Sequence, residues 1–171
     1  EREFQEDSIV YADSTIFKVF THPVLKGDAT TMLSRPYTMV MTESLARKYF
    51  GKDDPVGKTL KSIEGNLYEI TGVIRDLPGN LHLKFNGILS VATVRQQIGI
   101  ERFNDRSAGS FWNIGIFTYI MLKEGATIQP ILDKFPNFYT KYMKSLGDQI
   151  NGSFTLMAKP LARVHHYSSD L

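Results

Sequence analysis

Several short stretches of the chain are rich in β-branched and aromatic residues and are bounded by Gly, Pro, Asn or Asp, which is typical of strands. This pattern predicts strands at residues 9–12, 36–41, 59–63, 68–74 and 153–158, and an extended stretch at 81–90. Gly65 and Asn66 lie between two of these stretches, which are therefore expected to form a hairpin. The clearest alternation runs through residues 113–123, where one face carries Ile114, Ile116, Thr118, Ile120 and Leu122.

Two longer stretches repeat their apolar residues at helical spacing. Residues 43–50 form the first, with Thr42 in the N-cap position and Gly51 where a helix commonly ends. Residues 128–146 form the second, but Pro136 must kink this helix or split it in two, because proline cannot donate the backbone hydrogen bond.

Shorter elements and connections fill the rest of the chain. Asp13 or Ser14 can cap a short helix whose residues are nearly all apolar, so we expect it to be buried; its apolar members are Ile16, Phe17, Val19 and Phe20. A further short helix is expected at residues 91–98. Residues 22–28 are predicted to be a turn-rich connection, and residues 99–110 an exposed loop.

The order of these elements predicts an α+β fold, because strands and helices follow one another without a regular β-α repeat. The 171 residues are enough for one domain, or for two small lobes in one chain. The chain is 42% hydrophobic and 22% charged, which is ordinary for a globular domain.

Charge and composition exclude several classes of protein. The net charge is only +2, which argues against a dedicated nucleic-acid binder. The chain has no cysteine, so disulfides, thiolate catalysis and cysteine-based zinc sites are excluded. It lacks an apolar run of about 18 residues that could span a membrane, and its charged start is unlike a signal peptide. We expect it to be a piece of a larger protein.

The run Gly57-Lys58-Thr59 is similar to the end of a phosphate-binding loop. The full motif needs another glycine five residues before Gly57, and position 52 is Lys. It also needs a strand before the loop and a helix after it, whereas a helix precedes and a strand follows here. Gly57 is therefore interpreted as a turn residue.

The four histidines, His22, His82, His165 and His166, do not form a metal-binding pattern. His165 and His166 are adjacent, so on an extended segment their side chains point to opposite sides and cannot easily hold one ion. Asp105 and Asp170 could serve as further ligands, but no spacing supports them. We expect surface or capping histidines and no metal site.

Other polar groups also fall short of a catalytic pattern. Residues 107–110 (SAGS) lack the Gly-x-Ser-x-Gly elbow of a serine hydrolase. Two carboxylate pairs, Asp53 with Asp54 and Glu101 with Asp105, lie in predicted loops beside basic residues, which favours solvated charge over a general acid and base. We therefore predict no catalytic, cofactor-binding or metal-binding residue, and no enzyme.

Three large side chains have a structural interpretation. Met143 and Met157 are interpreted as core residues. Trp112 is either a core residue at the start of a strand or an exposed aromatic contact for a partner.

Eight segments, in order, resemble the periplasmic core domain of permeases of the MacB/FtsX type. They are residues 11–20 (YADSTIFKVF), 25–28 (LKGD), 39–51 (MVMTESLARKYFG), 54–60 (DPVGKTL), 68–78 (YEITGVIRDLP), 81–85 (LHLKF), 117–123 (FTYIMLK) and 160–168 (PLARVHHYS). The likeness covers most of the chain, whereas residues 91–112 have no clear counterpart.

The resemblance implies a MacB-like periplasmic core domain of an ABC transporter permease, N-terminally incomplete in this chain. Such a domain combines a mixed α/β, porter-like lobe with a smaller β-rich, sabre-like lobe. We expect the β-rich lobe at residues 21–90 and the α+β lobe at residues 1–20 with 91–171. The glycines of the pattern have a role in the fold: Gly72, within a predicted strand, indicates a bulge or a close backbone approach.

The resemblance also implies a function and partners. The domain would lie at the periplasmic face of the inner membrane, between two helices of a permease that dimerises and pairs with a cytoplasmic ABC ATPase. It would relay ATP-driven movement to exported cargo or to a periplasmic or outer-membrane partner, with no cofactor and no nucleic acid. The alternatives are a free-standing secreted or periplasmic binding module, and a small enzyme with its titratable groups in a pocket.

Overall fold

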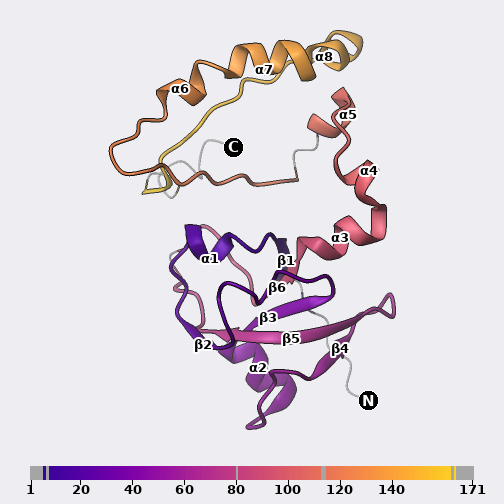
Figure 1. The fold of residues 1–171 in the computed structure, drawn as a ribbon, viewed down its shortest axis with the longest axis vertical. Coiled ribbons are helices and arrows are strands. Elements are labelled where there is room, and N and C mark those ends of the chain that lie inside the picture. Colours follow the sequence, from indigo (N-terminus) through magenta and orange to yellow (C-terminus); the bar gives the residue numbers. More distant parts are fainter. Residues whose placement is uncertain (1–5, 7, 80, 113–114, 163, 165–171) are drawn as a thin grey trace. The chain divides into compact units, whose positions relative to one another are not determined.

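The structure, a computed structural model, describes residues 6, 8–79, 81–112, 115–162 and 164 of the chain. Its contacts divide the chain into two units, Glu1–Phe103 and Asn104–Leu171 (Figure 1). Helices and a mixed sheet are both present, so the predicted α+β class is confirmed. The predicted lobes, 21–90 and 1–20 with 91–171, have different boundaries from these units and stay a prediction.

A mixed six-stranded sheet forms the centre of the first unit, and its main path runs β1-β6-β3-β5-β2. These strands are β1 (Ile9–Ala12), β6 (Gly87–Ser90), β3 (Thr38–Thr42), β5 (Leu67–Ile74) and β2 (Val24–Lys26). The pairs β1–β6 and β3–β5 are parallel, and the pairs β3–β6 and β2–β5 are antiparallel. The sixth strand, β4 (Thr59–Lys61), pairs with the start of β5 in an antiparallel hairpin.

Both faces of this sheet are covered, so its central strands carry apolar residues on both sides. Helix α2 (Glu43–Phe50) packs Leu45 and Ala46 against Met39, Met41 and other residues of one face. On the other face, Val40 and Ile88 pack with residues that include Ile16 and Phe17. All five residues of β3 are buried, which makes this strand the centre of the core.

Helix α2 begins and ends where the sequence predicts. The Thr42 hydroxyl accepts a hydrogen bond from the Leu45 N–H at 3.3 Å, which satisfies one of the exposed donors of the first turn. Gly51 ends the helix with a φ of 64°, and its N–H donates to the Arg47 carbonyl. The hairpin of β4 and β5 and the strand β1 also match their predictions.

Three connections differ from the prediction. The turn-rich stretch 22–28 contains β2, because Val24 and Lys26 pair with the end of β5. The stretch 99–110 is exposed as expected but contains α4 (Ile100–Phe103) and the start of α5 (Ala108–Phe111). Helix α1 (Ile16–Val19) was predicted to be buried but is only half-buried, because a single turn of helix packs on one side only.

Helix α3 (Val91–Ile98) confirms the prediction for residues 91–98, and α4 follows it at the end of the first unit. The second unit contains α5, α6 (Gln129–Leu132), α7 (Phe135–Tyr142) and α8 (Lys144–Ile150). The predicted helix 128–146 is split, as expected, with Pro136 in the first turn of α7, where its missing N–H costs nothing.

Aromatic contacts hold part of the second unit together. The Phe111 ring packs on Phe138 and Tyr142, and the Trp112 ring lies 4.5 Å from that of Phe154. The Trp112 Nε1–H donates to the Met143 carbonyl at 3.1 Å. These contacts favour the interpretation of Trp112 as a packing residue over that of an exposed partner contact.

Two predicted strands are absent from the described part of the second unit. Residues 115–123 and 152–160 form no strand, so the predictions for 113–123 and 153–158 are wrong; residues 113 and 114 lie outside the described residues. A strand is defined by its ladder of backbone hydrogen bonds, and the sheet of the described residues does not include these segments. Met157 is exposed and not a core residue, whereas Met143 is buried as expected.

Candidate functional site

Asp28 and Asp54 are exposed aspartates with lowered pKa values, and each closes a local turn. Hydrogen bonds from the Thr30 N–H and hydroxyl lower the pKa of Asp28. The pKa of Asp54 is lowered mainly by the hydrogen bond from the Val56 N–H, and next by the one from the Lys26 ammonium. In each case the ionised carboxylate accepts bonds that the neutral acid would lose. These groups are turn residues and do not converge on a common site.

Asp105 shows the same behaviour beside the serines at 107 and 110. The Ser107 hydroxyl and N–H and the Ser110 hydroxyl donate to its carboxylate, at 2.7, 2.9 and 2.8 Å, and lower its pKa. Both hydroxyls are therefore engaged as donors, and the cluster is exposed at the start of α5. This arrangement closes the turn that precedes α5 and does not indicate a nucleophile.

Asp76 joins the end of the sheet to α2. Its carboxylate accepts from the N–H of Ser44, at 3.0 Å, and from the Ser44 hydroxyl. Burial would raise the pKa of Asp76, but the bonds from Ser44 outweigh it and the pKa is lowered. A carboxylate at a helix N-terminus also interacts well with the helix dipole. Asp76 therefore stabilises the start of α2.

His22 lies in an aromatic cluster that the sequence did not predict. Its ring contacts those of Phe17, Phe20 and Phe85, with centroids 6.4, 5.9 and 5.7 Å away. Its Nε2 atom is buried and has no hydrogen-bond partner within the described part of the chain. Burial lowers the pKa of His22, so the neutral ring is favoured. His82 contacts the same Phe20 ring, at 6.2 Å.

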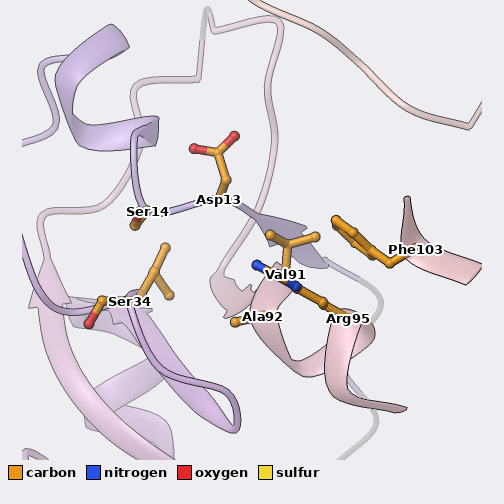
Figure 2. A pocket seen from close by; sticks show the side chains of 8 residues that line it. Asp13, Ser14, Ser34, Val91, Ala92, Arg95 and Phe103 are labelled. Atoms are coloured by element: carbon orange, nitrogen blue, oxygen red, sulfur yellow. The ribbon is translucent and has the colours of Figure 1, made fainter. Parts of the chain in front are cut away.

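A small pocket lies in the first unit where the parallel strands β1 and β6 end side by side. Ala12 pairs with Ser90, and the residues after this pair, Asp13 and Val91, lie in the pocket wall. The other lining residues are Ser14, Leu33, Ser34, Ala92, Arg95 and Phe103, and the volume is about 210 Å³ (Figure 2). This is below the roughly 300–1,000 Å³ of a typical small-molecule site.

The pocket wall holds one carboxylate, Asp13, and one cation, Arg95, which do not form a catalytic pair. Asp13 follows β1, and its carboxylate accepts hydrogen bonds from the N–H and hydroxyl of Thr15. Arg95 is exposed on α3 and, within the described residues, forms no ion pair. Arginine stays protonated and cannot act as a base, and the Asp13 carboxylate already accepts hydrogen bonds from Thr15, so the pocket offers no acid–base pair. Sequence spacing could not reveal it, because it depends on the pairing of β1 with β6.

The remaining candidates from the sequence lie apart from this pocket. The Gly57 N–H donates to the Ile70 carbonyl of β5 at 2.8 Å, so this donor is used within the fold and does not face phosphate. The Lys58 ammonium pairs with Asp53 at 3.0 Å on the surface. Groups of three His, Cys, Asp or Glu side chains that could hold a metal ion are absent from the described residues. His165 and His166 lie outside those residues, so the prediction for them stays a prediction.

Comparison with known proteins gives one family. Residues 1–138 match the family model described as the MacB-like periplasmic core domain. A search among curated proteins found no match. None of the described helices has the length and hydropathy that a transmembrane span needs.

Three solved structures are similar to the chain. The first is a domain of a permease protein from Porphyromonas gingivalis, with 23% identity, a TM-score of 0.56, and coverage of 78% of this chain and 58% of that one. The second is the periplasmic region of MacB from Actinobacillus actinomycetemcomitans, with 12% identity, a TM-score of 0.48, and coverage of 84% and 64%.

The third is the extracellular domain of the noncanonic ABC-type transporter YknZ from Gram-positive bacteria, with 19% identity, a TM-score of 0.43, and coverage of 89% and 71%. Only the first likeness is strong enough to show a shared fold. The chain spans less than two-thirds of the length of the first two structures.

Proposed function

The chain belongs to the MacB-like periplasmic core domain family, and from this we propose that it is the extracytoplasmic domain of an ABC transporter permease. The match over residues 1–138 is the observation that carries the proposal. It covers the whole sheet of the first unit and extends into α7 of the second. The polypeptide would be anchored at the periplasmic face of the inner membrane by segments outside this chain.

The domain acts mechanically and not as an enzyme. Its shifted carboxylates, Asp28, Asp54, Asp76 and Asp105, each hold a nearby turn or helix start, so none is poised to exchange a proton with a substrate. A sheet packed on both faces deforms little, since protein cores are close-packed. Such a body suits the transmission of movement from one surface to another.

The movement would come from a cytoplasmic ABC ATPase that pairs with the permease. Binding and hydrolysis of ATP would change the distance between two permease copies, in a homodimer or heterodimer, and the outer domains would follow. The moving surfaces would act on exported cargo or on a periplasmic or outer-membrane partner. Interface contacts, and no cofactor, would carry this function.

A labelling experiment tests this relay. Because the chain has no cysteine, Ile63→Cys introduces a single attachment point within it, on the fully exposed tip of the β4–β5 hairpin. In the complete permease assembled with its ATPase, donor and acceptor dyes at this position report the distance between two copies. We expect ATP to change the transfer efficiency and ADP to leave it unaltered. An ATPase variant that cannot bind nucleotide is the control.

One result would contradict the proposed relay of movement. A complex that hydrolyses ATP while the dye distance stays constant would show that the domain does not follow the ATPase cycle. Labels at Ile63→Cys and at Lys123→Cys, one in each unit, should be compared, because a movement confined to one unit would otherwise be missed.

A further inference from the structure

The side chain of His22 combines a buried polar atom with an apolar environment. Its Nε2 atom is buried without a hydrogen-bond partner, and among the described residues it is the one buried side-chain nitrogen or oxygen in this condition. Buried polar groups are almost always hydrogen-bonded, because leaving one unpaired costs free energy. The position of His22 therefore carries a cost that its ring contacts have to offset.

Aromatic rings from two parts of the first unit surround the His22 ring. Phe17 lies in α1 and Phe20 directly follows it, whereas Phe85 precedes β6 and is buried in the apolar cluster on one face of the sheet. The Phe20 ring is stacked on that of His22, with 25° between their planes, and the other two rings meet it edge to face. The His22 ring therefore joins α1 to the sheet.

This environment suits a neutral imidazole and not a charged one. Protonation makes both ring nitrogens donors, and Nε2 has no acceptor among the described residues. Burial is the cause that lowers the pKa of His22, and no neighbouring carboxylate offsets it. The face of the Phe20 ring attracts a cation, but more weakly than the water that a charged ring regains outside the cluster.

The charged and titratable groups on the neighbouring segments do not supply a counter-ion. Several are cations, or become cations in acid: Lys18, Lys26, Arg75, His82 and Lys84. The carboxylates on the same segments are engaged elsewhere, namely Asp13 by Thr15, Asp28 by Thr30 and Asp76 by Ser44. A proton on His22 would thus remain without a compensating negative charge.

Helix α1 has the least support of the segments that meet at His22. It is a single turn, contains no buried residue, and its N-cap residue, Thr15, makes no capping hydrogen bond with its side chain. The chain that follows His22 is held more firmly, since Val24 and Lys26 of β2 pair with β5. When the ring contacts of His22 are lost, α1 is therefore the first element to detach.

We propose that His22 is a pH-sensitive latch: its neutral ring holds α1 on the sheet, and when the ring takes up a proton α1 detaches while the sheet stays folded. Local opening needs less free energy than global unfolding, because it breaks the contacts of one short element. Ile16 and Phe17 would leave the apolar cluster that contains Val40 and Ile88. Mild acid would thus expose part of that face of the sheet.

The inference goes beyond the relay of movement and does not depend on it. The latch uses residues of the first unit alone, so it can be tested in the 171-residue chain. Its failure would leave the proposed permease function untouched, and the reverse also holds.

Nuclear magnetic resonance tests the latch between pH 7.5 and 5.0 on the ring carbons of His22 and on backbone amides. The N–H groups of Val19 and Phe20 report on α1, because they donate to the Thr15 and Ile16 carbonyls. Their protection is expressed relative to an unstructured chain at the same pH. We expect the His22 ring to titrate below pH 6.5 and the protection of Phe20 to fall at least about threefold with the same midpoint. The Val40 amide of β3 should stay protected throughout.

Two variants assign the effect to one histidine. His22→Phe keeps a ring in the cluster and removes the titration, so the protection of Phe20 should no longer fall in acid. His82→Phe is the matched control, because His82 also contacts the Phe20 ring, and the fall should persist in it. If too little His22→Phe folds, His22→Leu gives the same comparison.

Several results would overturn the latch. A His22 midpoint at or above 6.5 would show that its environment accepts the proton. Protection of Phe20 that stays constant while His22 titrates would show that α1 does not depend on the neutral ring. A fall that survives in both His22 variants, or disappears in His82→Phe, would assign the effect to another group.

Discussion

Thr71 and Gly72 determine how β3 and β5 fit together. The register between the strands shifts between Met39 and Val40, which pair with Ile70 and Gly72, so Thr71 forms a bulge. The Thr71 hydroxyl donates to the Met32 carbonyl at 2.7 Å. Beside it, the Met32 side chain lies against Gly72, where an added Cβ would come within 1.9 Å of the Met32 sulfur. The bulge and the close approach that the sequence predicts at Gly72 are both present.

A Gly72→Ala variant should therefore destabilise the first unit. Met32 is buried, so its side chain can move only by disturbing the core, and overpacking of this kind costs roughly 1–3 kcal/mol. Gly79→Ala is the matched control, because nothing lies within 4 Å of a Cβ at that position. Urea unfolding followed by circular dichroism measures both. Equal midpoints for the two variants would show that Met32 adapts without cost.

His22 should make stability depend on pH between neutral and mildly acidic conditions. Its folded pKa lies below the ordinary 6.5, so the unfolded chain binds the proton more readily, and stability falls as pH drops through 6.5. His22→Phe keeps an aromatic ring in the cluster and removes the titration. We expect this variant to lose less stability than the wild type between pH 7.5 and 5.5. The same loss in both proteins would contradict the assigned role of His22.

At the scale of elements, α2 shows what a local pattern can predict. Its cap, its apolar face and its terminal glycine all lie within residues 42–51, and the helix has the predicted bounds. The hairpin β4–β5 was predicted for the same reason, since its turn residues lie between the two strands. Residues 113–123 show the opposite case. Their alternation is strand-like, but a strand also requires a distant partner, which no local pattern specifies.

The contribution of Asp76 to α2 gives a second pH prediction. Its folded pKa is lowered below 3.8, so the stability it provides is complete above that value and is lost as pH falls through the folded pKa. Asp76→Asn should be less stable than the wild type at pH 7, and the difference should shrink as pH falls below about 3.8. Thermal unfolding from pH 7 to 2.5 measures it. A difference that stays constant would mean that the charge of Asp76 is not what stabilises α2.

The pocket and the aromatic cluster mark the limit of sequence reasoning about sites. Asp13 and Arg95 line one pocket only because β1 lies beside β6, and His22 contacts Phe85 only because of the sheet order. The lack of a phosphate-binding loop at Gly57 was easier to predict. The order of elements around Gly57 already excluded a phosphate loop, and in the structure its N–H donates to the Ile70 carbonyl of β5.

At the scale of the whole molecule, the first unit has two buried apolar clusters, whereas few of the second unit's described residues are buried. The family match spans the first unit completely and the second in part. In the proposed permease, ATP hydrolysis would be carried out by the cytoplasmic ABC ATPase, and the domain itself would need no nucleotide site.

The purified 171-residue chain should therefore hydrolyse no ATP. Phosphate release, measured at increasing chain concentrations, should stay at the level of the buffer. A rate that rises in proportion to the chain concentration, and remains after a second purification step, would contradict a purely mechanical role.

The coding sequence on both sides of this chain tests the central claim most directly. A domain between two membrane helices requires an apolar run of about 20 residues beyond each end in the parent protein. We predict both runs, with the upstream one separated from the chain by further residues of the domain. A stop codon directly after Leu171 and a cleavable signal sequence upstream would contradict the permease, and would favour a secreted binding module.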